Sequence, residues 1–198
     1  MISFMVIAAP RSGTAWAANW LTNGLNHCIH DPLWDYHYAE LDKIEMPGKM
    51  IGVACTGMAL WPDWINRHPA PKVILHRPQN QVNESARRLG FPPCPSGIFK
   101  GLDLIRGFHV EWESLFHRDH ARDIYEHLLL PEPFDEQRHE MLCTLNVTSN
   151  IEARRQNPRV FDKLRAEGIP AIDDATPDQR PLQPAAGPAD AAGHKDPD

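Results

Sequence analysis

The chain is poor in cysteine and has no long hydrophobic run. Its 198 residues include four cysteines, and no two of them form the C-x-x-C pair that marks many zinc and redox sites. They are Cys28, Cys55, Cys94 and Cys143. We therefore expect reduced, buried thiols in a cytoplasmic protein, with no bound metal. No run approaches the roughly 18–20 apolar residues of a membrane span, so we expect no membrane partner.

Positive charge is also scarce. The chain carries 20 Lys and Arg against 26 Asp and Glu, which gives a net charge of −6. This acidic balance, in a chain without a nucleic-acid-binding pattern, argues against a nucleic-acid partner. The length and a hydrophobic share of 42% are sufficient for one domain with a real core.

The composition changes after residue 167. Residues 168–198 contain six of the nineteen prolines, six aspartates and no aromatic residue. Such a segment cannot bury enough apolar surface to offset the entropy that is lost on ordering. We therefore predict a domain over residues 1–167 and a mobile, Pro/Ala/Asp-rich tail over residues 168–198.

The first twenty residues contain the most informative local pattern. Apolar residues 2–8 lead into Ala9-Pro10-Arg11-Ser12-Gly13-Thr14, and a helix-compatible segment follows. Strand, tight loop and helix together predict an anion cradle, because the first N–H groups of a helix have no partner within it. Gly13 lets the backbone approach a ligand, and Arg11 adds a planar cation suited to phosphate or sulfate oxygens. An ordinary strand-to-helix turn is the alternative interpretation.

This loop does not match the pattern of nucleotide triphosphatases. When Gly13 is aligned with the second glycine of G-x-x-x-x-G-K-[ST], the other three defining positions fail. They hold Ala8, Thr14 and Ala15. Without the hydroxyl that binds Mg²⁺, ATP or GTP chemistry loses its main charge-neutralising partner. The loop therefore suits a phosphate-like group whose transfer needs no metal.

Ala9 to Trp16 resembles the P-[KR]-S-G-T-T-W loop of sulfotransferases, which grips the 5′-phosphosulfate of 3′-phosphoadenosine 5′-phosphosulfate (PAPS). The second motif of that family is a strand that ends in Arg, with a Ser eight residues later. Lys72 to Arg77 followed by Ser85 is similar to it. The resemblance covers roughly residues 2–89.

The resemblance implies that PAPS is the sulfuryl donor and that Arg77 and Ser85 hold its 3′-phosphate. The residues of the first motif that it implies as PAPS-binding are Arg11, Ser12, Gly13, Thr14, Ala15 and Trp16. Ala15 replaces the second threonine of the family, and Trp16 is expected beside the adenine.

Hydrophobic patterning predicts the remaining elements. The expected strands are residues 2–8, a short strand from His27 that runs into a turn at Asp31-Pro32, then 50–55 and 72–76. The expected helices follow the first loop and cover 80–90, 98–130 as one or two helices, 134–147 and 151–167. Together they predict a three-layer P-loop α/β fold, with a parallel sheet of four or five strands and a helical C-terminal half.

His30 and Asp31 are the candidates for the catalytic base. Ligands of open α/β sheets gather beyond the carboxyl ends of the strands, and these two residues follow the second strand. Cytosolic sulfotransferases carry a catalytic histidine after a threonine, but this chain has Thr56-Gly57 there. The base would then come from Asp31 or His30, as in carbohydrate-type relatives. The alternative is a structural His30 and an Asp31 that caps the segment from Leu33.

The sequence thus predicts a sulfotransferase that moves a sulfuryl group from PAPS to a hydroxyl or amine of a small-molecule or carbohydrate acceptor. Arg11 and the loop amides would stabilise charge on the transferred group, while the base takes the acceptor proton. Two alternatives stay open. One is a catalytically inactive nucleotide-binding or scaffold protein of the same fold. The other is a degenerate P-loop kinase with Asp31 as the base.

Overall fold

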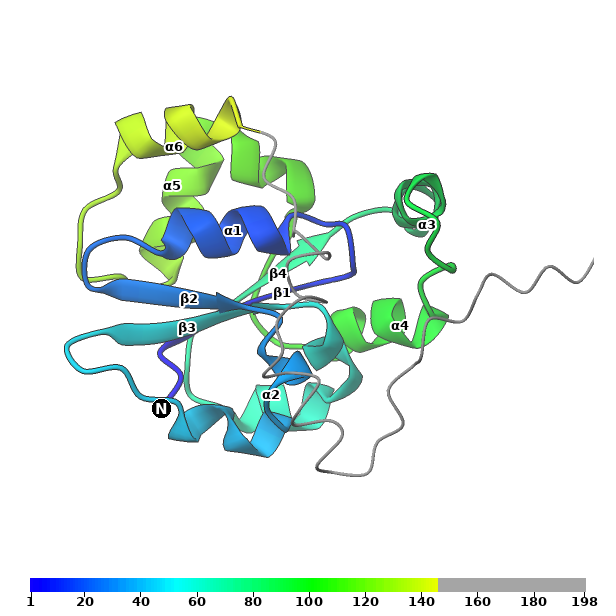
Figure 1. The fold of residues 1–198 in the computed structure, drawn as a ribbon, viewed down its shortest axis with the longest axis horizontal. Helices are drawn as coiled ribbons and strands as arrows, with labels where there is room; N and C mark the ends of the chain where they lie inside the picture. Colours follow the sequence, from blue (N-terminus) through cyan, green and yellow to red (C-terminus); the bar gives the residue numbers. More distant parts are fainter. Residues whose placement is uncertain (146–198) are drawn as a thin grey trace, which may run out of the picture. The chain divides into compact units, whose positions relative to one another are not determined.

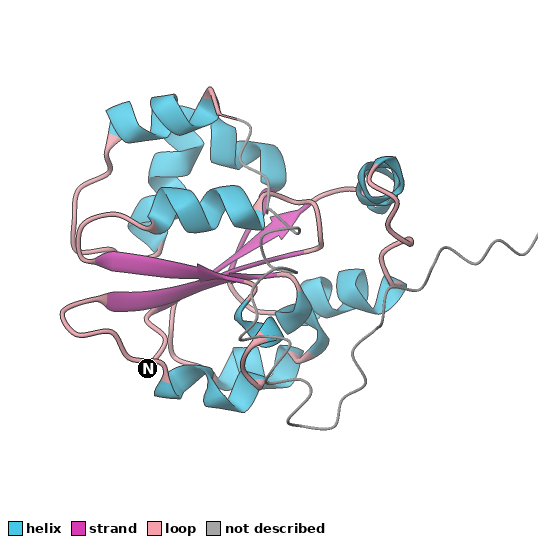
Figure 2. Ribbon diagram, in the orientation of Figure 1, coloured by secondary structure: helices cyan, strands magenta, loops and turns pink. Residues whose placement is uncertain are grey.

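The computed structural model describes residues 1–145, which form one five-stranded sheet with helices on both faces (Figures 1 and 2). The strands are β1 (Phe4–Ala8), β2 (Asn26–His30), β3 (Met50–Cys55), β4 (Lys72–His76) and β5 (Phe108–Glu111). They are all parallel and lie in the order β2-β3-β1-β4-β5. The predicted α/β fold with a parallel sheet is confirmed.

The central strand β1 shows why these residues form a parallel sheet. All five of its side chains are buried, and in the register Ile7 pairs with Cys55 of β3 and Ile74 of β4. A strand that is covered on both faces needs a continuous apolar run, not an alternating one. The run Phe-Met-Val-Ile-Ala meets this requirement.

Helices cover each face of the sheet over a separate hydrophobic cluster (Figure 1). On one face lie α1 (Thr14–Leu21), α5 (Arg118–His127) and α6 (Glu136–Cys143); on the other lie α2 (Pro62–Arg67) and α4 (Ser96–Leu104). The helix α3 (Gln79–Arg88) follows β4. Four short 3-10 helices are η1 (Pro32–Trp34), η2 (Tyr38–Lys43), η3 (Gly57–Leu60) and η4 (Trp112–Phe116).

The expectation of one or two helices over residues 98–130 is wrong in its middle part. The helix α4 ends at Leu104, and β5 then adds a fifth strand beside β4. In β5 half-buried Phe108 and Val110 alternate with exposed His109 and Glu111, which is the two-residue period of an edge strand. The stretch is short, and His109 also fits a helical spacing, so the helical pattern hid the strand.

The helix predicted over residues 134–147 is present as α6, which ends at Cys143. The helix predicted over residues 151–167 and the tail predicted over residues 168–198 lie outside the described residues. Within the described part of the chain, no helix is both long enough and apolar enough to cross a membrane.

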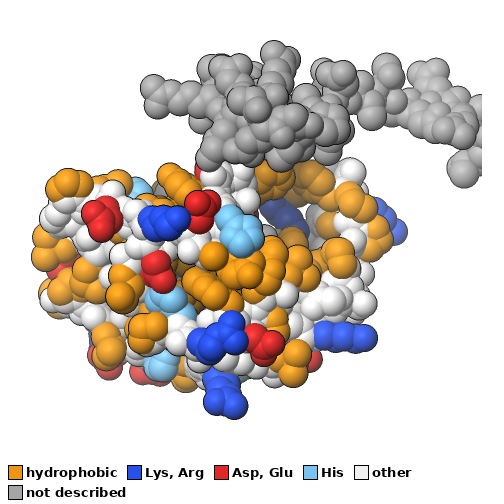
Figure 3. Space-filling view, turned by 90° about the horizontal axis from the view of Figure 1, so that it is seen from below, with side chains coloured by type: hydrophobic (Ala, Val, Ile, Leu, Met, Phe, Trp, Pro, Cys, Tyr) orange, Lys and Arg blue, Asp and Glu red, His pale blue; other side chains and the backbone are white. Residues whose placement is uncertain are grey.

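The face that carries α2 is packed with aromatic side chains. Tyr38 stacks on Trp61 with ring centroids 4.9 Å apart, and it meets Trp64 edge-on at 5.6 Å. Figure 3 views the molecule from below and shows hydrophobic side chains gathered in the middle of the visible face, with charged side chains scattered around them. Aromatic packing therefore joins η2 to the segment that precedes β4.

The close approach of Gly101 to the backbone of η3 gives a stability prediction. A β-carbon on Gly101 of α4 would lie 1.8 Å from the carbonyl oxygen of Ala59. Gly101→Ala should therefore lower the free energy of unfolding by about 1–3 kcal/mol or more, as measured by urea denaturation. Gly97→Ala on the same helix is the matched control, since a β-carbon there meets nothing within 4 Å. Equal stability of the two variants would contradict the close contact.

Candidate functional site

The loop between β1 and α1 makes two sharp turns. Arg11 has φ 65° and Gly13, the N-cap of α1, has φ 87°, in the left-handed region that favours glycine. A β-carbon on Gly13 would also lie 2.8 Å from Cδ1 of Leu115 in η4. Gly13 is therefore required both by the turn and by the packing of η4 against it.

Two kinds of polar group in this loop have no protein partner in the described part of the chain: the first N–H groups of α1, which no side chain caps, and the hydroxyl of Ser12. No side chain caps the first turn of α1, so its backbone N–H groups keep the partial positive charge of a helix N-terminus. The side chain of Ser12 is fully buried, and its hydroxyl has no hydrogen-bond partner among the described residues. A buried orphan hydroxyl is costly, and a bound oxyanion beside the loop is one group that would satisfy it.

The two sequence motifs meet at this loop. Arg77 follows β4, and its guanidinium donates to the backbone carbonyl of Arg11. Nε of Arg11 in turn donates to the hydroxyl of Ser85 on α3 at 3.3 Å. The structure thus brings Arg11, Arg77 and Ser85 together, although 66 residues separate the two arginines along the chain.

Arg11 and Arg77 lie close together, and within residues 1–145 neither forms an ion pair. Burial lowers the pKa of the Arg77 guanidinium, Glu113 opposes this shift, and the charge of Arg11 adds to it. Two neighbouring guanidinium groups with no ion pair are an arrangement that an anion would stabilise.

His30 and Asp31 form a second polar group at the same edge of the sheet. His30 Nε2 lies 3.2 Å from the Thr14 hydroxyl and 3.2 Å from Asp31 Oδ2. Asp31 Oδ1 accepts hydrogen bonds from the backbone N–H and the hydroxyl of Thr56, at 2.8 and 3.2 Å. This series of contacts joins the loop between β1 and α1 to the ends of β2 and β3.

The capping role considered for Asp31 is not what the structure shows. Asp31 occupies the N-cap position of η1 but makes no side-chain cap hydrogen bond. Its carboxylate turns to Thr56, and its own φ is 46°, one of three positive φ values at non-glycine residues in the described part of the chain. Strained backbone of this kind clusters at functional sites, and Asp tolerates it better than most residues.

A cavity of about 210 Å³ opens beside Asp31. Its lining consists of Asp31, Leu33, Trp34, Cys55, Thr56 and Gly57. The side chains of His30 and Asp31 each remain 15% exposed, so both are accessible. Burial, and to a smaller degree the charge of Asp31, raises the pKa of Cys55 to about 12. That thiol therefore stays protonated near neutral pH, and Asp31 supplies the carboxylate of the lining.

Trp16 does not lie where the resemblance implied. It is 3% exposed, and its indole N–H donates to the carbonyl of Leu142 in α6 at 3.1 Å. The ring therefore packs in the core under α1, away from a ligand on the loop. Ala15 is half-buried at the start of the same helix, and its carbonyl accepts a hydrogen bond from Asn19.

Sequence reasoning missed two residues of the site. The sequence gives no reason to place Thr56 in the site, because only the glycine after it departs from the family pattern. The sequence predicts Trp112 as part of a helix. In the structure its ring centroid lies 4.2 Å from the guanidinium carbon of Arg77. Trp112 belongs to a segment remote from both motifs, and Thr56 binds Asp31 across 25 residues of chain. Neither contact has a local signal in the sequence.

A larger surface hollow lies elsewhere, at the start of α5. It measures about 420 Å³ and is lined by His117, Arg118, Asp119, His120 and Glu140. Arg118 and Asp119 already pair there at 3.4 Å. Within residues 1–145 no group of three or more His, Cys, Asp or Glu side chains could hold a metal ion. The edge that carries the loop and Asp31 is therefore the candidate site.

Comparisons with models of protein families, with curated proteins and with solved structures found no match to this chain.

The strained Asp31 gives a prediction for stability. Asp31→Ala removes the acceptor of two Thr56 hydrogen bonds and places alanine in the left-handed region, so it should cost about 1–3 kcal/mol of unfolding free energy. Asp31→Asn keeps an oxygen acceptor and a residue that tolerates the turn, so it should cost clearly less. Asp123→Ala on the exposed surface of α5 is the control. Urea unfolding that ranks Asn below Ala at position 31 would contradict this view of the turn.

Proposed function

We propose that the protein is a PAPS-dependent sulfotransferase built on an α/β fold of the P-loop type. The observation that carries the proposal is the meeting of the two motifs, where Arg77 donates to the backbone of Arg11 and Arg11 donates to Ser85. β1 and β4 are neighbouring parallel strands, so the residues that follow them meet at their carboxyl ends, where both motifs could hold one ligand. The acceptor is a small molecule or a carbohydrate. The four free cysteines agree with a cytoplasmic location.

The loop and the two arginines fit the anionic groups of PAPS. The open N–H groups of α1, the orphan hydroxyl of Ser12 and the guanidinium of Arg11 would hold the 5′-phosphosulfate. Arg77 and Ser85 would hold the 3′-phosphate. The buried Trp16 supports the loop from the core side in this assignment and leaves the adenine to other groups.

The cavity beside Asp31 would receive the acceptor. Asp31 lines it and is the natural base, whereas His30 lies between Asp31 and Thr14 and fixes the position of the carboxylate. PAPS supplies the sulfuryl group and, when its S–O bond breaks, leaves as 3′-phosphoadenosine 5′-phosphate. Asp31 takes the proton of the acceptor hydroxyl as its oxygen bonds to sulfur. Arg11 and the loop amides stabilise the charge that collects on the leaving phosphate.

A melting experiment tests nucleotide recognition. We expect 3′-phosphoadenosine 5′-phosphate to raise the melting temperature more than ADP or Mg-ATP does, since a ligand at 100 times its Kd adds about 2.7 kcal/mol. Arg77→Ala should lose roughly 1.5–3 kcal/mol of affinity for the 3′-phosphorylated nucleotide and hardly change that for ADP. Arg11→Ala should weaken both ligands.

Arg88→Ala is the matched control for charge, because Arg88 lies on α3 and pairs with Glu84 away from the loop. Equal stabilisation by all three nucleotides would refute the assignment of the 3′-phosphate site. Selective stabilisation by Mg-ATP would favour the kinase alternative.

The identity of the base is tested by transfer. Asp31→Asn should cut sulfuryl transfer by at least about a hundredfold and leave nucleotide binding unchanged, because it removes the proton acceptor. His30→Ala should have a smaller effect, because it removes only the contact that positions the carboxylate. The assay needs an acceptor, so labelled PAPS is first screened against carbohydrate, phenolic and amine acceptors. Full activity of Asp31→Asn would overturn the assignment. A parent protein that binds the nucleotide but sulfates no acceptor would favour the non-catalytic alternative.

A further inference from the structure

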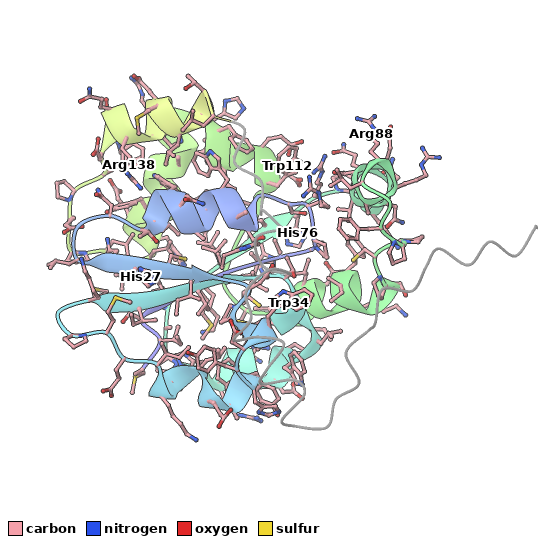
Figure 4. All side chains as sticks on the ribbon, viewed as in Figure 1. His27, Trp34, His76, Arg88, Trp112 and Arg138 are labelled. Atoms are coloured by element: carbon pink, nitrogen blue, oxygen red, sulfur yellow. The ribbon has the colours of Figure 1, made fainter. Side chains whose placement is uncertain are left out.

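The guanidinium of Arg77 lies over the face of the Trp112 indole ring. It lies in η4, directly after β5, and the guanidinium carbon is 4.2 Å from the ring centroid. Figure 4 labels Trp112 and also His76, the last residue of β4. The contact between Arg77 and Trp112 therefore joins the ends of β4 and β5 at the candidate site.

Arg77 is held from several sides, and none of the groups that hold it is a carboxylate. One guanidinium nitrogen donates to the carbonyl of Arg11, Nε donates to Gln81 at 3.4 Å, and the face rests on Trp112. These contacts fix the plane of the guanidinium without forming an ion pair. A cation that is oriented in this way can present its remaining N–H groups to an anion in a defined direction.

Packing alone does not account for a tryptophan at position 112. Its indole nitrogen is buried and has no hydrogen-bond partner in the described part of the chain. A buried orphan donor is unfavourable, and leucine or phenylalanine would fill this position without one. Tryptophan, however, is the ring that attracts a cation most strongly. The contact with the Arg77 guanidinium therefore explains why a tryptophan occupies position 112.

Aromatic contacts through Phe116 link Trp112 to α1, the helix that follows the loop after β1. Phe116 packs edge-on against Trp112 with centroids 5.4 Å apart and against Trp16 with centroids 5.2 Å apart. Trp16 is a buried residue of α1 and is fixed by its hydrogen bond to Leu142. From the same short helix, Leu115 reaches Gly13. One segment, η4, thus contacts both motifs.

We propose that Trp112 is the positioning residue that orients Arg77 and thereby sets the preference for nucleotides that carry a 3′-phosphate. The inference rests on the proposed function, because that function names the 3′-phosphate as the ligand of Arg77. Trp112 acts through Arg77 and does not itself touch the nucleotide. Recognition of the phosphate therefore depends on a residue of the C-terminal half, outside both sequence motifs.

The test compares Trp112→Leu, Trp112→Phe and the parent protein by calorimetry with 3′-phosphoadenosine 5′-phosphate and with ADP. Trp112→Leu should weaken the 3′-phosphorylated nucleotide between about threefold and thirtyfold, the range of a cation–π contact, and leave ADP unchanged. Trp112→Phe keeps an aromatic face and should retain most of the preference. Trp64→Leu, a half-buried tryptophan on α2, is the control for loss of packing.

A nuclear magnetic resonance spectrum of the side-chain N–H groups reports the stacking without any nucleotide. The Nε–H signal of Arg77 should be shielded by the ring current in the parent protein and in Trp112→Phe, and should lose that shift in Trp112→Leu. A parent protein that binds both nucleotides equally would refute the proposed function itself. If the parent prefers the 3′-phosphorylated nucleotide and Trp112→Leu keeps the full preference, the positioning role is refuted alone.

Discussion

The hydrogen bond from Arg77 to the backbone of Arg11 is the contact on which the site depends. It joins the end of β4 to the turn after β1 in a partly buried place, where the charges of the two arginines interact. Burial lowers the pKa of the Arg77 guanidinium; the charge of Glu113 opposes that shift, and the charge of Arg11 adds a smaller lowering. Trp112 and Ser85 hold the two cations in place without neutralising them. Two arginines without ion pairs among the described residues, at the carboxyl ends of the strands, suit a ligand with several negative charges.

The register between β2 and β3 positions the second polar group of the site, which is formed by His30 and Asp31. His30 of β2 pairs with Ala54 of β3, and the backbone N–H of Asp31 donates to the carbonyl of Ala54 at 2.9 Å. This pairing carries Asp31 to the level of Thr56, where the carboxylate finds both of its donors. The Thr14 hydroxyl then reaches His30 from α1. The series of polar contacts from Thr14 through His30 and Asp31 to Thr56 therefore results from strand pairing and not from any local motif.

The sequence predicts those parts of the protein whose signals are local. Continuous apolar runs indicated β1, β3 and β4. The 3′-phosphate role that the resemblance implies for Arg77 and Ser85 stays a prediction, although Ser85 accepts a hydrogen bond from Arg11 of the first loop. The strand β5 was missed because four residues that alternate around His109 also fit a helix. Trp16 was misplaced because a linear motif does not show which face of α1 turns to the core. Thr56 and Trp112 could not be predicted, since their roles arise from contacts between distant segments.

The polar outward face of β5 has a consequence for how copies of this protein meet in a crowded solution. A parallel sheet has two open edges, and a long, flat, hydrophobic edge strand invites pairing with another chain. Here β5 has only four residues and exposes His109 and Glu111, while the opposite edge, β2, includes Asn26 and two histidines in its five residues. Short edges with polar or charged side chains are poor templates for further strands. The arrangement that hid β5 from the sequence pattern therefore also guards the sheet against edge-to-edge aggregation.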